Sequence, residues 1–258
     1  ARADVPVDDQ IINVTQIDEG SFGVGRARMQ YRDLLPGRFG GRLIASHIRI
    51  PRGGAVPDSV HHHNVCFQMI FCINGWVRVV YEDQGQPIVM ERGDCVLQPP
   101  HIRHQVLECS DMMEVVEISC PAEHETFIDH EMQLPTSTLR PGRDFGGQHF
   151  VFHEMKNASW THSDCHGFEY CDTGIEKAAG GTASALVIRA TGKSKEIRLL
   201  HNTQIRFLFI LGGTATLESE KQYRLRPWDA CTIPPGNTEE LRDISTDLEY
   251  LEVTLLTQ

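Results

Sequence analysis

Three histidines and a glutamine have the types and spacing of a metal site built on antiparallel strands. His61 and His63 are two residues apart, so on a strand both point to one face while His62 points to the other. Gln68 follows soon after, and His104 comes after a Pro-Pro turn. Imidazole nitrogens and a carboxamide oxygen are donors for divalent transition metals. The sequence therefore predicts that His61, His63, Gln68 and His104 bind one cation.

The predicted ligands are uncharged, so they leave the full charge of the ion uncompensated. Such an ion is a stronger Lewis acid and favours an anionic ligand, for example a carboxylate or an enolate. Four protein donors leave room for a substrate on a metal that prefers five or six ligands, which is typical of a catalytic site. We expect one divalent transition metal per chain, Fe(II) or Mn(II), with Zn(II), Ni(II) and Co(II) chemically allowed.

Apolar residues near the ligands are candidates for a substrate-binding wall. If Gln68 points inward, alternation along its strand places Ile70 and Cys72 on the same face, and His104 does the same for Val106. An apolar wall around one charged ion suits a small, partly apolar anion as substrate. Ordinary packing inside a barrel explains the same pattern.

Three further features carry weaker signals. Gln98 is a polar candidate for orienting a substrate, although it could equally face solvent. His101 is a candidate acid or base at the rim of the site, and an exposed turn is the favoured interpretation. The segment from His162 to Cys171 reads H-x2-C-H-x4-C, but this spacing fits no standard structural zinc motif, so we expect loop residues there.

Short strands are the elements that must position these residues. Segments of alternating apolar residues are separated by Gly, Pro, Asn and Asp turns, which is the pattern of an antiparallel sandwich or barrel. Helical periodicity is scarce, and 122–132 is the best short helix candidate. The predicted strands are 43–50, 66–73, 76–81, 95–98, 104–108 and 113–120.

The order of features in the first half of the chain returns in the second. For example, the segment from Asp94 to Pro100 is matched by the segment from Asp229 to Pro235. A connector rich in Pro and Gly lies between the copies. We therefore expect two β domains, a metal-binding domain at 1–134 and a second domain at 135–258.

The second copy lacks the predicted ligand set. Laid over each other, the copies align His61 with Leu199, His63 with His201, Gln68 with Arg206 and His104 with Glu239. One histidine with these neighbours cannot hold a metal, so the second domain is predicted to be metal-free. We expect it to cover the first barrel or to form an oligomer interface. A buried polar network of Arg206, Glu239 and His201 is the alternative.

Composition excludes several classes of function. The chain has 258 residues, 40% of them hydrophobic, and a formal net charge of −11, which opposes binding to nucleic acid. No apolar run is long enough to span a membrane, and the first residues lack the apolar core of a signal peptide. The eight cysteines fall mainly in strand-like runs, so we expect reduced, buried thiols and a cytoplasmic protein. A homodimer is also expected, because sheet faces and edges would be exposed.

The first copy resembles the cupin superfamily in both of its sequence motifs. Four departures matter: Ala55 replaces the leading Gly of the first motif, Gln68 its Glu, His101 the Gly of the second motif and Glu108 its Asn. The resemblance extends over both halves and is that of a bicupin with a degenerate C-terminal cupin. It implies two tandem double-stranded β-helix (jelly-roll) barrels, an all-β fold. The first motif matches at His61, His63, Gln68 and Gly75, and the second at Gly93, Pro99 and His104.

The resemblance implies a metal-dependent enzyme that acts on a small molecule with a carbonyl or carboxylate group. Bicupins with three histidines resemble gentisate-type and related dioxygenases, so we expect a non-haem dioxygenase. Cupins with a similar His and Gln set include isomerases and lyases, so a non-oxidative isomerase, lyase or decarboxylase is the first alternative. A non-catalytic small-molecule-binding cupin is the second.

Overall fold

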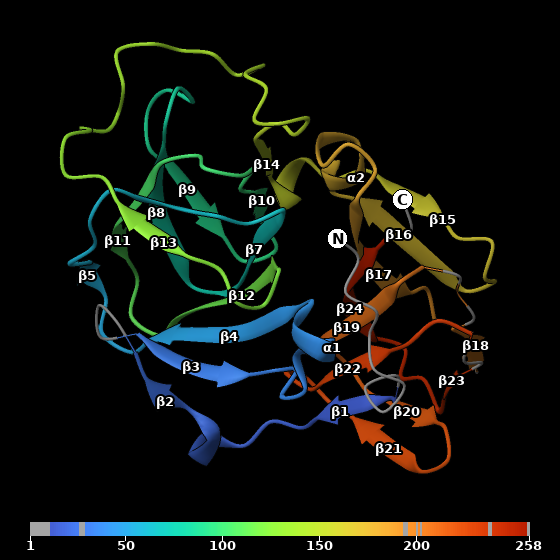
Figure 1. Ribbon diagram of the computed structural model, residues 1–258. Helices are drawn as coiled ribbons and strands as arrows, with labels where there is room; N and C mark the ends of the chain where they lie inside the picture. The colour runs from blue at the N-terminus through green and yellow to red at the C-terminus, as the bar shows by residue number, and fades with distance from the viewer. Residues whose placement is uncertain are drawn as a thin grey trace. The chain divides into compact units, whose positions relative to one another are not determined.

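Antiparallel β-sheets make up nearly all the regular structure of the chain (Figure 1). The structure is a computed structural model, and it describes residues 11–25, 29–192, 196–199, 201, 203–236 and 239–256. The helical segments are single short turns, so the predicted all-β class is confirmed. They are η2 (Glu19–Ser21), α1 (Arg38–Gly41), η4 (Met155–Asn157) and α2 (Ile175–Ala178).

The N-terminal unit comprises Gly20–Asn157 and Lys177–Gly180. It has a seven-stranded sheet in the order β14-β10-β7-β12-β4-β3-β2 and a six-stranded sheet in which β13-β6-β11-β8-β9 are neighbours and β5 pairs with β11. Its strands are β2 (Gly23–Val24), β3 (Gln30–Asp33), β4 (Ile44–Ile50), β5 (Gly54–Ala55), β6 (His61–His63), β7 (Phe67–Asn74), β8 (Trp76–Tyr81), β9 (Ile88–Glu91), β10 (Cys95–Leu97), β11 (His104–Cys109), β12 (Met113–Cys120), β13 (Thr126–Ile128) and β14 (Val151–His153).

The C-terminal unit comprises the described residues up to Glu19, Ala158–Glu176 and Gly181 onward. It has a seven-stranded sheet in the order β1-β22-β19-β24-β17-β16-β15 and a four-stranded sheet, β18-β23-β20-β21. Its strands are β1 (Asn13–Thr15), β15 (Trp160–His162), β16 (Phe168–Asp172), β17 (Ala183–Ala190), β18 (Glu196–Arg198), β19 (Ile205–Gly212), β20 (Ala215–Glu218), β21 (Gln222–Leu225), β22 (Ala230–Ile233), β23 (Glu240–Arg242) and β24 (Glu249–Leu255).

The two units have the same strand order in their larger sheets. The third and fourth strands are β7 and β12 in one sheet and β19 and β24 in the other, and in each sheet these two strands pair with one another. Each unit also takes an edge strand from a segment outside its sequence repeat. These edge strands are β14, which pairs with β10, and β1, which pairs with β22.

These edge strands make the compact units differ from the predicted domain ranges. Residues 151–153 pair with the N-terminal unit and residues 13–15 pair with the C-terminal unit. Strand pairing joins segments that are distant in sequence, so composition alone does not reveal where a unit ends. The assignment of domains to 1–134 and 135–258 stays a prediction about folding units.

All six predicted strands are present, with ends shifted by at most one residue, as in β7 and β10. The predicted helix at 122–132 is wrong. Part of this segment forms the edge strand β13, which pairs with β6. Phe127 and Ile128 remain exposed there, so the apolar spacing that suggested a helix reflects no buried helical face.

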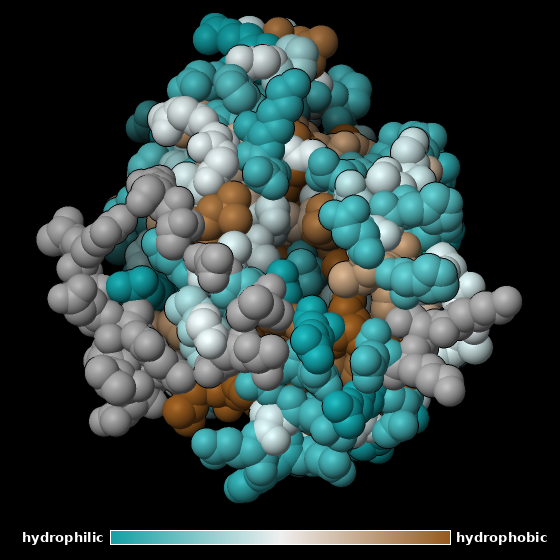
Figure 2. Space-filling view, turned by 90° about the vertical axis from the view of Figure 1, so that its right-hand side faces the viewer, coloured by the Kyte–Doolittle hydropathy of each residue, from teal (hydrophilic) through white to brown (hydrophobic). Residues whose placement is uncertain are grey.

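Alternation along the strands produces the core of each unit. In the N-terminal unit Val77, Val79 and Val115 pack inside with the methionines at 29, 90 and 113. The face of the molecule in Figure 2 is mainly hydrophilic, in keeping with the strong negative charge. Within the described residues, no helix is long and apolar enough to cross a membrane.

The cysteines only partly match the prediction. All eight are free, and five are buried. Cys66 and Cys165 are exposed and Cys120 is half-buried, so the prediction that the thiols are buried is wrong for these three. They lie at strand ends and in a turn, where the alternation that buries a strand residue no longer applies.

Candidate metal centre

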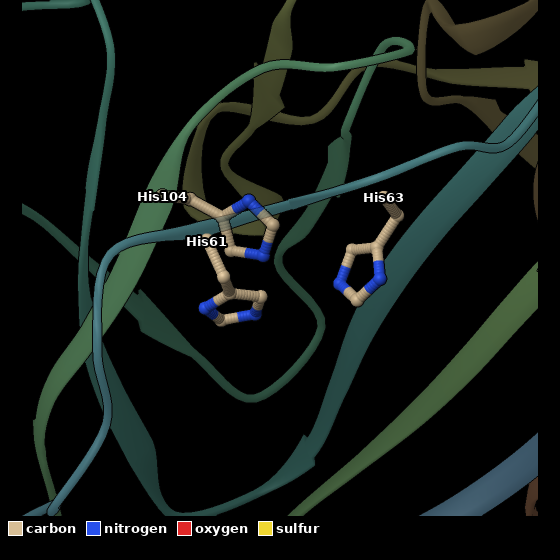
Figure 3. Close-up of side chains that lie close together, drawn as sticks. All are labelled: His61, His63 and His104. Atoms are coloured by element: carbon tan, nitrogen blue, oxygen red, sulfur yellow. The ribbon is translucent and has the colours of Figure 1, made fainter. Parts of the chain in front are cut away.

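Three histidine side chains meet inside the N-terminal unit (Figure 3). His61 and His63 lie on β6 and are buried, while His62 between them points outward. His104 begins β11 and is the cross-strand partner of His61. One nitrogen from each ring lies within 4.8 Å of the others. The sequence prediction that these histidines converge is therefore confirmed.

Hydrogen bonds behind the rings orient two of the histidines toward a common centre. The Nδ1 of His61 donates to the carbonyl of Ser59 at 2.7 Å, and the Nδ1 of His104 donates to the carbonyl of Ile102 at 3.1 Å. A carbonyl only accepts, so each of these rings keeps its proton on Nδ1 and has a lone pair on Nε2. Orientation of this kind is typical of metal-binding histidines.

His63 is anchored by a side chain of the edge strand. Its Nδ1 lies 2.9 Å from the Thr126 hydroxyl, and Thr126 is its cross-strand partner on β13. The segment predicted to be a helix thus supplies a contact behind the metal centre.

A buried carboxylate stands behind His61. The Oδ1 of Asp58 lies 3.6 Å from the His61 Nδ1, and its Oδ2 accepts from the backbone of Val106 at 3.0 Å. A carboxylate behind a ligating imidazole increases the basicity of the ring. Asp58 therefore offsets part of the charge that the uncharged ligand set leaves on a cation, a contribution that the sequence analysis missed.

Gln68 lies beside the histidines and is connected to His104 through Gln98. The Gln98 amide donates to the Gln68 Oε1 at 3.0 Å and lies 3.4 Å from the His104 Nε2. The Gln68 amide nitrogen is buried and has no hydrogen-bond partner among the described residues. The role of Gln68 as a fourth ligand stays a prediction, because its oxygen already accepts one hydrogen bond and has one further lone pair.

The residues present fit a divalent transition metal. Three ring nitrogens lie close together in a buried site, and carbonyl acceptors hold two of the rings with Nε2 unprotonated. The donor set suits Fe(II), Mn(II), Zn(II), Ni(II) or Co(II) and would bind a hard cation such as Ca²⁺ poorly.

The metal centre opens into a cavity of about 70 Å³. Ile70, Gln98 and Val106 line it, as the sequence predicts for a substrate-binding wall, and their role in binding stays a prediction. Cys72 does not line it but packs in the core, because β7 continues past the cavity toward the turn at Gly75. Burial raises the pKa of the Cys72 thiol to about 12, so it is inert.

His101 lies outside the cluster of three histidines. Its φ of 62° is in the left-handed region that favours glycine, which explains why a glycine is the expected residue at this place in the motif. Its Nδ1 lies 3.4 Å from the Nδ1 of His62, on the outer side of β6. His101 is exposed, which agrees with the interpretation as a turn.

Sequence reasoning missed two polar residues of the cavity, Tyr81 and Glu117. Tyr81 is the cross-strand partner of His104, and its hydroxyl donates to the Gln98 Oε1 at 2.9 Å. Burial and the nearby Glu117 raise the pKa of Tyr81, so the phenol stays protonated. Glu117 on β12 is the one carboxylate among the residues described as lining the cavity. The available signal was its position two residues after Val115, on the face of β12 that alternation turns inward.

Comparison with known protein families finds a match within the N-terminal unit. Residues 46–119, which lie within this unit, match the Cupin domain family. No curated protein sequence matches the chain.

Solved structures extend the likeness to the fold of almost the whole chain. Protein YlbA from E. coli is similar over 99% of this chain and 95% of its own, at 10% identity and a TM-score of 0.72. Oxalate decarboxylase from Bacillus subtilis is similar over 88% of this chain and 71% of its own, at 14% identity and a TM-score of 0.63. Another structure of that decarboxylase was studied for its Mn(II) centres. At these identities the likeness establishes a cupin-like fold.

Proposed function

We propose that this protein is a metal-dependent enzyme that acts on a small organic anion with a carbonyl or carboxylate group. One observation carries the proposal: three buried histidines, with Nδ1 hydrogen-bonded behind two of the rings, converge at a cavity. A structural metal site would be closed by protein ligands, whereas this one borders open space.

The architecture we propose is a bicupin with a degenerate C-terminal cupin. The shared strand order of the two larger sheets and the likeness to YlbA over nearly the whole chain support it. The C-terminal unit has no corresponding group of three ligands among the described residues.

The metal we propose is Fe(II) or Mn(II), held by His61, His63 and His104 with Gln68 as fourth donor. The three nitrogen donors and one neutral oxygen donor support a first-row metal, and the oxalate decarboxylase likeness adds weight to manganese. When bound, such a metal supplies Lewis-acid polarisation of a coordinated oxygen. Zn(II), Ni(II) and Co(II) are the alternatives.

The cavity supports a small substrate. About 10–15 Å³ of such space holds one water molecule, so about 70 Å³ holds roughly five to seven non-hydrogen atoms. Its walls are largely apolar, and the uncharged ligand set favours a negatively charged guest. A small carboxylate or enolate anion matches these conditions.

The chain's own residues provide for orientation and proton transfer. The Gln68 amide nitrogen, which has no partner among the described residues, is available to donate to a substrate oxygen. Tyr81 holds Gln98 in place through the hydroxyl hydrogen bond. Glu117 is placed to take a proton from a substrate carbon or return one to it, since its carboxylate borders the cavity.

Two reaction classes follow, and they differ in whether dioxygen is consumed. The sequence resemblance favours a dioxygenase. Glu117 favours non-oxidative chemistry such as isomerisation, C–C cleavage or decarboxylation, because these reactions need a proton donor or acceptor at the reacting carbon. Without either reaction, a site that still binds anions would be a non-catalytic binding module.

The test is to load the purified chain with Fe(II) or Mn(II) under argon and to supply small keto acids, dicarboxylates and enolisable diketones. Dioxygen uptake after admission of air identifies the dioxygenase, and turnover under argon identifies the non-oxidative enzyme. Protein that takes up no transition metal would overturn the proposal. The predicted homodimer is a separate question, which light scattering answers.

A further inference from the structure

The C-terminal unit contains a cavity of its own of about 360 Å³, larger than the cavity of about 70 Å³ at the metal centre. Its walls come from the central strands β17, β19 and β24 and from the segment around β18. Leu186, Ile188 and Leu199 provide apolar surface, and Arg206, Tyr250 and Glu252 provide buried or mostly buried polar groups. His162, Asp164 and Arg198 also line the cavity. Neither the proposed function nor the comparisons assign a role to this cavity.

Arg206 is the mostly buried cationic group of the cavity, whereas Arg198, which also lines it, is 74% exposed and pairs with Glu240. It lies on β19 opposite Thr254, so it occupies the same inward face as Tyr250 and Glu252 of β24. Its Nε lies 3.5 Å from the Glu252 Oε2 but has no hydrogen-bond partner among the described residues. The guanidinium is mostly buried, with 17% of the side chain exposed. A buried guanidinium with unused donors is well suited to a carboxylate, which accepts two parallel hydrogen bonds.

Tyr250 is an independent indication of a ligand. Its side chain is fully buried and lines the cavity, yet its hydroxyl has no hydrogen-bond partner among the described residues. Buried hydroxyls are normally hydrogen-bonded, and an unpaired one calls for a specific explanation. Burial raises the pKa of Tyr250 well above its ordinary value, so the group stays a hydrogen-bond donor.

Glu252 does not prevent an anion from binding beside Arg206. Burial raises the pKa of Glu252 despite the nearby arginine, so this carboxyl group takes up a proton more readily than an exposed one. A metal is not the expected occupant, because no group of three ligating side chains is present among the described residues of this cavity. His201 points elsewhere: its Nε2 donates to the carbonyl of Ile233 and its Nδ1 lies 2.7 Å from the Thr203 hydroxyl.

We propose that the C-terminal unit binds a small monocarboxylate with an apolar body in this cavity, through Arg206 and Tyr250 and without a metal. The mostly buried Arg206 guanidinium matches one carboxylate, the Tyr250 hydroxyl donates to the same group, and the leucine and isoleucine walls contact the apolar part. The volume accommodates an aromatic carboxylate such as benzoate, which is larger than the roughly five to seven non-hydrogen atoms that the cavity at the metal centre holds.

Calorimetric titration of the full chain with benzoate tests the proposal, with the isosteric but uncharged benzamide as its matched ligand. We expect benzoate to bind with a Kd on the order of 1 mM or tighter. Benzamide should bind at least about tenfold more weakly, because it cannot form the charged bidentate pair. If benzoate does not bind at concentrations of about 1 mM, the proposal is overturned.

Variants locate the ligand. Arg206→Met should weaken benzoate binding at least about tenfold, and Tyr250→Phe about threefold, as expected for a charged and a single neutral hydrogen bond. Arg242→Gln is the matched control, because this exposed arginine of the same unit pairs with Glu240 and lies outside the cavity. If Arg206→Met does not fold, as judged by circular dichroism, Arg206→Lys and Tyr250→Phe decide the matter, with the same direction expected.

His61→Ala separates this site from the metal centre. The variant should bind benzoate as the wild type does, because His61 belongs to the N-terminal unit. Loss of benzoate binding in His61→Ala with full binding in Arg206→Met would place the ligand at the metal centre and overturn the proposal. These binding measurements test the C-terminal site whether or not the proposed enzyme activity is found.

Discussion

The inner faces of the two units have equivalent strands but different polar residues. On β12 and β24 a glutamate occupies the same inward place, Glu117 in one unit and Glu252 in the other. On β7 and β19 the corresponding residues are Gln68 and Arg206. The histidines of the N-terminal unit have no equivalent cluster among the described residues of the C-terminal unit.

The replacements explain why no group of three ligating side chains forms among the described residues of the C-terminal unit. Leu199 is part of the hydrophobic core, and both nitrogens of His201 are engaged by neighbouring oxygens. Glu239 is buried, and burial raises the pKa of its carboxyl group. The predicted network of Arg206, Glu239 and His201 is not formed by hydrogen bonds, because Arg206 pairs with Glu252 instead. The comparison teaches that strand order sets where a cavity lies, while a few inward residues set what it holds.

The largest expected effect comes from removing a histidine ligand. His61→Ala should abolish stoichiometric metal binding and lower activity by more than about 100-fold, since even residues behind a ligand contribute 10–100-fold. His62→Ala is the matched control on the same strand and should retain the metal, because its ring points outward. Elemental analysis by mass spectrometry measures both. Equal metal content in the two variants would contradict the assignment of the site.

Glu117→Gln should impair the reaction without removing the metal. A general acid or base contributes about 10²–10⁴-fold, so kcat should fall at least about 100-fold if the reaction moves a proton. Glu108→Gln serves as the control, because Glu108 is half exposed and pairs with Arg78 at the surface. Unchanged kcat in Glu117→Gln would show that the reaction needs no carboxylate at the cavity.

Substitution of one buried tyrosine in each unit tests the comparison between the units through the free energy of unfolding. Tyr81→Phe should lower the free energy of unfolding by about 1–2 kcal/mol, because it leaves the buried Gln98 Oε1 without its donor. Tyr250→Phe should stay within about 0.5 kcal/mol of the wild type, because its hydroxyl has no protein partner. Urea unfolding without added ligand measures both differences. A similar loss in both variants would show that the Tyr250 hydroxyl is bonded.

The smallest expected effect is a pH dependence at Glu252. Burial raises the pKa of Glu252 in the folded protein, so above the ordinary glutamate pKa of about 4 the unfolded chain loses its proton first. Glu252 therefore disfavours the folded state progressively as pH rises. Glu252→Gln should gain stability relative to the wild type between about pH 4 and pH 7, as measured by urea unfolding.

The matched change at the surface should have the opposite sign. The hydrogen bond from Arg242 lowers the pKa of Glu240 in the folded protein. Its ionised form stabilises the fold above the ordinary glutamate pKa, and this contribution is lost as pH falls through the lowered value. Glu240→Gln should therefore lose a little stability relative to the wild type at neutral pH. The same sign in both variants would contradict the assignment of either shift.

Local pattern was sufficient to predict the strands and the histidine cluster. Alternation along β8 and β12 gave their ends to the residue, because burial on one face depends on neighbours in sequence. The H-x-H spacing placed His61 and His63 together for the same reason. The prediction of a helix at 122–132 is wrong because part of this segment pairs with β6 as an edge strand. An edge strand whose main role is to complete the backbone hydrogen bonds of its neighbour needs little apolar alternation, so the sequence pattern did not reveal it.

The sequence by itself determined the all-β class, the repeated order of strands and the three histidines, since each follows from periodicity or from a short motif. The tertiary structure decided the rest. It brought Asp58, Tyr81 and Glu117 to the metal centre, placed His101 outside it, and gave each unit an edge strand from a distant segment. These features depend on strand register and on pairing between remote segments, which set the neighbours of a side chain and leave no local trace in the sequence.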